Sequence, residues 1–305
     1  MNMTEISGNA GTLMWTLNDG ALTISGNGKM PDYAILEDED SENPLPPWYS
    51  HNSNITTVMI ENGVENIGEY AFANCYNLNS ITIPDGVTSI GKSAFYGCDG
   101  LISIMLPDSI TFIGRWAFFG CNSLISATIP KGMTYIEHYV FALCKSLTSI
   151  TIPNSITKIG DAFLCCESLK HIYLQCATPP VIHEHLYEIN VNDCILHVHV
   201  GSKDRYEQTK GWKKFKNIQE DIKMSKYIAV YKSKISVDGL ERMTEQTYEF
   251  SSETEPSESV ATSAIKKYIS FLNDASGKNT YQFVELVSIR KANVLDKIEN
   301  GFQKK

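Results

Sequence analysis

A 23-residue period runs through the middle of this 305-residue chain. An Ile-Pro or Leu-Pro pair returns at 83–84, 106–107, 129–130 and 152–153. A phenylalanine recurs with the same period, at Phe72, Phe95, Phe118, Phe141 and Phe163. The last interval is one residue shorter than the others. A fixed period of this size predicts a solenoid, because each unit can bury its apolar side only by stacking on a neighbour. A solenoid offers an extended surface, which favours binding over catalysis.

One unit, residues 78–100, shows how the period is expected to fold. Ile81 and Ile83 alternate with Ser80 and Thr82, which is typical of a short strand with one buried face. A proline and a turn pair then end the strand. Residues 93–95 are predicted to form one helical turn that places the phenylalanine in the core. Five such units cover about 55–168, and a closing strand extends to 174.

A cysteine follows each phenylalanine after three residues, at Cys75, Cys98, Cys121, Cys144 and Cys166. All five occupy one phase of the repeat, so they are expected to form a column. Cysteine is small and is often buried as a free thiol. We therefore interpret these residues as packing residues rather than disulfide partners or metal ligands.

Composition narrows the choice of partner. The net charge of −9 argues against nucleic acid, whose phosphates require a clustered basic face. No apolar run is long enough to cross a bilayer. The first five residues show no secretory signal, which leaves two alternatives open: a protein that stays inside the cell, or a signal that is missing from this sequence.

These repeats resemble the leucine-rich repeats of the bacterial BspA-like family, with the pattern IP-x-x-V-x-x-I-G-x-x-A-F-x-x-C-x-x-L-x-x-I-x-IP. The resemblance covers about residues 8–220. It includes an N-terminal cap hairpin at 15–26 with Asp19-Gly20 as its turn, a lead-in at 47–49, and a C-terminal cap that runs to Ile218. Glu137 stands where the pattern has glycine and Val140 where it has alanine, so a local distortion of the fourth unit is expected. Residues 34–46 resemble an insertion.

The predicted architecture is an α/β solenoid of leucine-rich repeats between two caps, followed by a small domain. Its parts are an N-terminal cap and lead-in at 1–54, repeats at 55–174, a C-terminal cap at 175–222 and a separate α+β domain at 224–305. In that last domain the strand candidates are 227–231, 246–250 and 281–289. Apolar residues at helical spacing between Val260 and Leu272 predict a helix before the third strand. The expected order is therefore ββαβ, as in a docking, dimerisation or anchoring module.

The outward strand positions form the candidate ligand-binding face. They comprise small hydroxyl residues interrupted by three larger side chains: Ser80, Thr82, Ser103, Met105, Ser126, Thr128, Ser149, Thr151, His171 and Tyr173. Met105, His171 and Tyr173 would be the anchors of a partner. The alternative is that serine and threonine are merely soluble residues that strands tolerate.

Four histidines lie close together in the sequence, at His183, His185, His197 and His199. His197 and His199 would share one face of a strand and could bind zinc or nickel together. The preferred interpretation is that Leu196 and Val198 face the core while both histidines face water. No metal site and no cofactor are assigned.

No catalytic residue is assigned either. Cys165 and Cys166, followed by His171, do not make a convincing nucleophile and base, because Cys166 belongs to the buried column. The family resemblance implies a non-catalytic protein that binds a protein or glycan, in adhesion or recognition at the bacterial cell surface or as a secreted protein. The alternative is an intracellular scaffold whose C-terminal module docks or dimerises.

Overall fold

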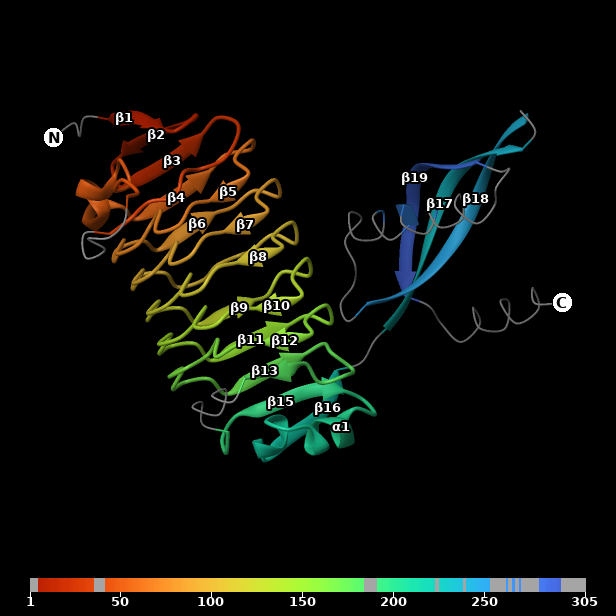
Figure 1. Ribbon diagram of the computed structural model, residues 1–305. Coiled ribbons are helices and arrows are strands. Elements are labelled where there is room, and N and C mark those ends of the chain that lie inside the picture. The colour runs from red at the N-terminus through yellow and green to blue at the C-terminus, as the bar shows by residue number, and fades with distance from the viewer. Residues whose placement is uncertain are drawn as a thin grey trace. The chain divides into compact units, whose positions relative to one another are not determined.

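The computed structural model describes residues 5–35, 42–183 and 191–222 in full. It also describes the backbone of 225–237, 240–252 and 280–291, together with Thr262, Ile265, Lys266 and Ile269. The chain forms two units, Met1–Ile222 and Lys223–Lys305 (Figure 1). Among the described residues, no helix has the length and apolar character needed to cross a bilayer.

An antiparallel sheet of β1 (Ile6–Ala10), β2 (Leu13–Asn18) and β3 (Ala21–Ser25) begins the first unit. Asp19 (φ 46°) and Gly20 (φ 79°) form the turn between β2 and β3. Two consecutive residues with positive φ are characteristic of tight hairpins, so the expected cap hairpin is confirmed. A short 3₁₀ helix, Tyr49–Asn54, precedes β4 (Thr57–Ile60), which pairs in parallel with β3.

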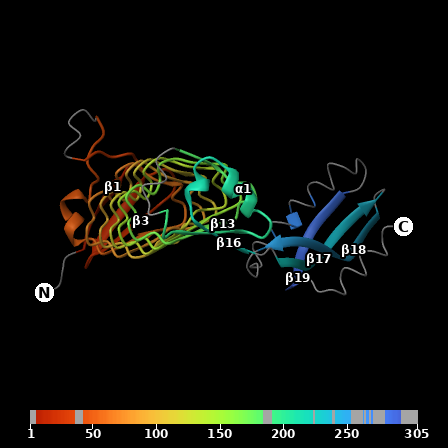
Figure 2. The same cartoon turned by 90° about the horizontal axis from the view of Figure 1, so that it is seen from below.

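The first strand ladder of the solenoid runs parallel from layer to layer. It contains β4, β6 (Ser80–Thr82), β9 (Ser126–Thr128), β11 (Ser149–Ile152), β13 (His171–Leu174), β15 (Ile195–His199) and β16 (Asn217–Ile222). The ladder is divided between β6 and β9, where Ser103 makes only an isolated bridge to Ser126. Figure 2 shows the layers superposed as one flattened coil.

A second ladder is made of two-residue strands. Three lie in each of two sheets: β5 (Asn66–Ile67), β7 (Ser89–Ile90) and β8 (Phe112–Ile113), then β10 (Tyr135–Ile136), β12 (Lys158–Ile159) and β14 (Val181–Ile182). The interruption coincides with Glu137. A Cβ atom on the equivalent Gly91 or Gly114 would lie 2.5–2.6 Å from backbone nitrogen of the preceding layer. The expected distortion of the fourth unit is therefore present, because a side chain at this phase separates the layers.

Two columns of identical side chains fill the interior. The rings of Trp48, Phe72, Phe95, Phe118, Phe141 and Phe163 stack in succession with centroids 5.2–6.0 Å apart. Beside them, the Sγ of Cys98 donates to the backbone oxygen of Phe72 at 3.1 Å, and the next two units repeat this bond. All eight cysteines are free thiols, and every one except Cys165 is buried. The interpretation of the cysteine column as packing residues is confirmed.

The α/β character of the repeats is not confirmed. Residues 55–174 are all described and contain strands and turns without a helix. In the first four units the expected helical turn is interrupted by a residue with positive φ two positions before the phenylalanine: Tyr70, Ser93, Trp116 and Tyr139, at 53–64°. Such a backbone cannot continue a right-handed helix, so the repeats form a β-solenoid.

The C-terminal cap closes the stack with α1 (Lys203–Gln208) and a 3₁₀ turn at Trp212–Lys214. The Tyr206 hydroxyl donates to the backbone oxygen of Cys176 at 2.7 Å, and Nε1 of Trp212 donates to that of Pro180 at 2.8 Å. Both aromatic residues are completely buried. These two bonds attach the cap to the last layers.

The second unit contains a three-stranded antiparallel sheet in the order β18-β17-β19. The strands β17 (Ser225–Val237), β18 (Leu240–Ser252) and β19 (Thr280–Lys291) include all three strand candidates from the sequence. Between β18 and β19 the described residues Thr262, Ile265, Lys266 and Ile269 are helical, with both isoleucines buried. The remainder of the expected helix lies outside the described residues, so an α+β domain is not confirmed.

Candidate functional site

The register of the first ladder places the outward positions in two rows. One row joins Ser126, Ser149 and His171, and the other joins Thr128, Thr151 and Tyr173. Ser103 extends the first row through its bridge to Ser126. Ser80 and Thr82 are exposed on β6, where they pair with Thr57 and Met59. Each candidate residue therefore lies on the outward side of the ladder, while the isoleucine or alanine between each pair is buried.

Exposed apolar side chains lie where the ladder is divided, in the middle of this face. Met105 is 86% exposed, the highest value among the large hydrophobic residues that are described. Ile102 and Ile125, in the same and the next layer, are each about half exposed. The amide of Ile125 donates to the oxygen of Ile102 at 3.0 Å, so the two lie side by side. Sequence analysis did not identify these isoleucines, because they precede the alternating segment.

A chain of polar contacts closes the far end of the face. Nδ1 of His171 lies 3.0 Å from Nε2 of His197, and Nδ1 of His197 lies 2.7 Å from Oδ2 of Asp221. The ring of Tyr173 stacks on His197 at 4.2 Å. The expectation that His197 faces water is wrong, because neighbouring rings leave it 7% exposed. His199 instead contacts the oxygen of Gln175 at 3.0 Å, while Leu196 and Val198 are buried as expected.

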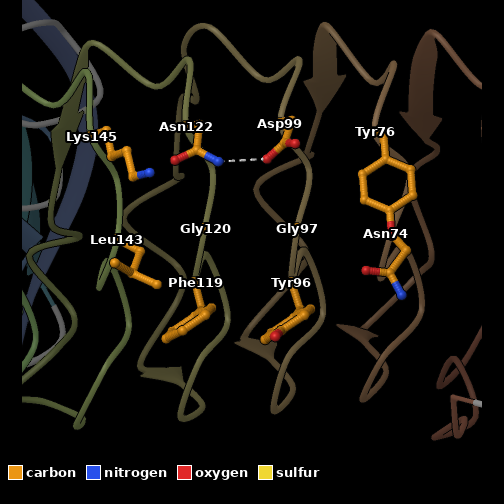
Figure 3. A pocket seen from close by; sticks show the side chains of 10 residues that line it. All are labelled: Asn74, Tyr76, Tyr96, Gly97, Asp99, Phe119, Gly120, Asn122, Leu143 and Lys145. Atoms are coloured by element: carbon orange, nitrogen blue, oxygen red, sulfur yellow. Dashed lines mark hydrogen bonds between the residues drawn. The ribbon is translucent and has the colours of Figure 1, made fainter. Parts of the chain in front are cut away.

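A shallow hollow of about 260 Å³ lies on the turns that follow the phenylalanine column (Figure 3). The residues that line it come from three positions of the repeat. The first position contributes Asn74, Gly97, Gly120 and Leu143, the second contributes Tyr76, Asp99, Asn122 and Lys145, and the third contributes Tyr96 and Phe119. The rings of Tyr96 and Phe119 stack at 5.1 Å, and Nδ2 of Asn122 donates to Oδ1 of Asp99 at 2.9 Å. Oδ1 of Asn122 is buried and accepts no hydrogen bond from the described residues.

A second histidine cluster lies where three neighbouring strands of the second ladder end. His138 follows β10, Asp161 follows β12 and His183 follows β14. Nδ1 of His138 lies 3.1 Å from Oδ2 of Asp161, and Nδ1 of His183 lies 2.9 Å from Oδ1. The two imidazole rings contact each other edge to face at 4.9 Å. Of the four histidines noted in the sequence, His185 lies outside the described residues.

Asp161 is 3% exposed but remains ionised. Burial raises the pKa of its carboxyl, and hydrogen bonds from His183 and His138 outweigh that effect, so the pKa lies below its ordinary value. Sequence analysis missed both His138 and Asp161. Asp161 follows His138 after 23 residues, and His183 follows Asp161 after 22, so the repeat period itself was the available signal.

The cysteine column offers no nucleophile. Burial raises the pKa of Cys75 and of Cys166 to about 12, and that of Cys98, Cys121 and Cys144 well above the ordinary value. A thiol in this state reacts poorly, because the thiolate is the attacking species.

Comparison with known proteins identifies the repeats. The BspA type leucine rich repeat region matches residues 48–170 in six copies. No curated protein matches the chain.

Several solved structures match part of this chain. A leucine-rich repeat protein of T. pallidum is 22% identical over 60% of this chain and 90% of its own, with a TM-score of 0.43. A leucine-rich repeat protein of Bacteroides ovatus is 22% identical over 62% and 60%, with a TM-score of 0.38. The pneumococcal vaccine antigen PcpA is 20% identical over 68% and 46%, with a TM-score of 0.32.

The repeat pattern, the stacked phenylalanines and the family match all concern the same part of the chain. Residues 48–170 belong to the BspA-type leucine-rich repeat family.

Proposed function

We propose that this protein is a non-catalytic recognition protein that binds a protein partner on the outward face of its first strand ladder. The observation that carries the proposal is the group of exposed apolar side chains at Ile102, Met105 and Ile125. Soluble proteins seldom expose apolar residues together unless a partner covers them. Methionine suits such a role, because its flexible side chain adapts to the surface it meets.

The surrounding residues support a rim around this apolar centre. Serine and threonine rows flank it, and Tyr173 and His171 stand at the far end. Protein interfaces commonly combine an apolar centre with a polar border, and aromatic residues contribute strongly to affinity. The family membership of the repeats favours the same general role.

Binding can be tested with the purified full chain, labelled and applied to immobilised extracellular matrix proteins, mucins and a glycan array. Replacing Ile102, Met105 and Ile125 together by serine is expected to abolish binding to any protein ligand that the wild type retains. The control is Phe112→Ser, which removes a half-exposed apolar residue from the second ladder. If the triple variant binds as tightly as the wild type, this face is not the binding surface.

The proposed location is the bacterial surface or the medium, where the protein would act in adhesion or recognition. The family resemblance supports it, and an intracellular scaffold with a docking or dimerisation module at 224–305 is the alternative. Protease treatment of intact source cells, followed by a blot for the repeats, separates the two. Cleavage while a cytosolic control survives supports display, and protection until lysis supports the scaffold.

A glycan is the second candidate ligand, and the hollow in Figure 3 favours it. Asp99, Asn122 and Lys145 offer a carboxylate, an amide and an ammonium group beside the aromatic residues Tyr76 and Tyr96. Sugars are held by such polar groups together with aromatic rings. If the array shows a glycan whose binding is lost in Asp99→Ala and kept in the triple serine variant, the hollow is the binding site.

A further inference from the structure

Three donor side chains meet at one edge of the second ladder because of the parallel register. Ile136, Ile159 and Ile182 are aligned across β10, β12 and β14. His138 and Asp161 lie two residues beyond the aligned isoleucines, and His183 lies one beyond. Parallel strands end at the same edge of a sheet, so this topology gathers the three side chains without any long loop.

We propose that His138, Asp161 and His183 form a binding site for a divalent transition metal ion of the zinc type. Each residue offers one ligand atom, and these atoms lie within 4.8 Å of one another. Two imidazole nitrogens and one carboxylate oxygen are a donor set that zinc prefers. Calcium and magnesium favour sites made of oxygen atoms alone, so they do not suit this cluster.

The separations between the donor atoms fit a shared ion. Two ligands bound to one zinc ion at about 2.0–2.1 Å and at the tetrahedral angle lie about 3.3 Å apart. The distance from Nδ1 of His138 to Oδ2 of Asp161 is 3.1 Å, and that from Nδ1 of His183 to Oδ1 is 2.9 Å. Both are close to that value, and each involves a different oxygen of the carboxylate. Both histidines present Nδ1 to the carboxylate, so both would bind the ion through Nδ1 and carry their proton on Nε2.

The burial of the three side chains also suits binding. Asp161 is buried and lies between the two histidines, so its carboxyl group is at the centre of the cluster. The His183 side chain is 45% exposed, which leaves it room to adjust, while the His138 side chain is 18% exposed. The ion would reach Asp161 from the side of His183.

The other histidine pair is a matched comparison within the same chain. Nδ1 of His171 and Nε2 of His197 also approach to 3.0 Å. Asp221 contacts the opposite nitrogen of His197, so within the described part of the chain only two possible metal ligands converge there. A carboxylate in that place can orient a metal-binding histidine, but it cannot itself be the third metal ligand. We therefore assign the metal to the cluster at Asp161.

The test uses the untagged full chain, stripped with chelator and kept in a non-thiol reductant. Its thermal unfolding is followed by circular dichroism with zinc chloride or magnesium chloride, and zinc binding is measured by calorimetry. Zinc at a hundredfold excess over its dissociation constant is expected to raise the melting temperature by about 5 °C, and magnesium is expected to have no effect.

The variants Asp161→Asn and His183→Ala should each lose the zinc shift and the calorimetric signal. If Asp161→Asn fails to fold, the conclusion rests on His183→Ala, which should still fold because the His183 side chain is partly exposed. His171→Ala and Cys165→Ser should keep the shift, since they alter the other histidine pair and the least buried thiol. The proposal is overturned if zinc has no effect on the wild type, if the shift survives His183→Ala, or if it is lost in His171→Ala.

Discussion

Inside the solenoid, successive layers carry the same residue at the same phase, whereas on the outward face the residue changes from layer to layer. Phe95 and Phe118 stack with their rings parallel within 2°. At the same layers the outward positions alternate between Thr82, Met105 and Thr128. The comparison teaches that layers stack well only when side chains of equal volume recur at each buried position, so the interior specifies the fold. The outward positions are not constrained in this way and can vary to suit a partner.

The largest expected difference between the two regions is in thiol chemistry. With a pKa of about 12, Cys75 and Cys166 are ionised at pH 8 in about one molecule in ten thousand. A thiol reagent at pH 8 should therefore label the partly exposed Cys165 alone, as mass spectrometry can show. Rapid labelling of Cys75 in the folded protein would contradict the interior assignment.

The same buried thiols predict a dependence of stability on alkaline pH. Because the folded pKa is raised, the unfolded chain loses these protons first as the pH rises. The stabilisation is complete below about pH 9 and is lost as the pH approaches 12. Denaturant unfolding at several pH values should show that decline.

Truncation of a ring should separate the interior from the surface in stability. Phe118→Ala removes a completely buried side chain between Phe95 and Phe141 and should cost about 3–5 kcal/mol. The control Thr128→Ala changes an exposed residue of the next strand and should stay within about 0.5 kcal/mol. If Phe118→Ala and Thr128→Ala unfold at the same denaturant concentration, the two regions do not differ in their contribution to stability.

A smaller loss is expected where two layers touch through their backbones. Gly91→Ala would place a Cβ atom 2.5 Å from the amide nitrogen of Glu69, and such overpacking should cost about 1–3 kcal/mol. Glu137→Gly makes the opposite change at the same phase. It should not destabilise the protein, and it should strengthen hydrogen-exchange protection near Ile113, where the second ladder is interrupted.

The smallest effect on stability is expected on the outward face. Met105→Ser should shift the free energy of unfolding by less than about 0.5 kcal/mol, because the side chain is almost fully exposed. If Met105→Ser destabilises the protein as much as Gly91→Ala, the residue is structural and the contrast between the regions fails.

Sequence analysis predicted the features that repeat the same residue. The phenylalanine and cysteine columns, the cap hairpin and the three C-terminal strands follow from period, alternation and turn pairs. The predicted helical turn was wrong, because Ser93 and Trp116 have positive φ. The sequence gives no sign of this backbone conformation, since neither residue is a glycine. The division of the first ladder at Ser103 was equally invisible, since the strand pattern there looks like that of its neighbours.

The candidate sites were harder to predict, because they combine different residues at one phase. His138, Asp161 and His183 are far apart in the sequence and become neighbours only when the chain is read down a column. The lining of the hollow has the same origin: Tyr76, Asp99, Asn122 and Lys145 share one phase. Aligning the units by period and reading every column would have found both groups.

The direction of the hydrogen bonds between layers has a mechanical consequence. In a parallel ladder these bonds lie across the strands, and therefore along the axis of the stack. Each layer is attached to its two neighbours alone. A force that pulls the solenoid lengthwise would load all layer boundaries equally, and the first to open would be the one where Ser103 is joined to the ladder by a single bridge.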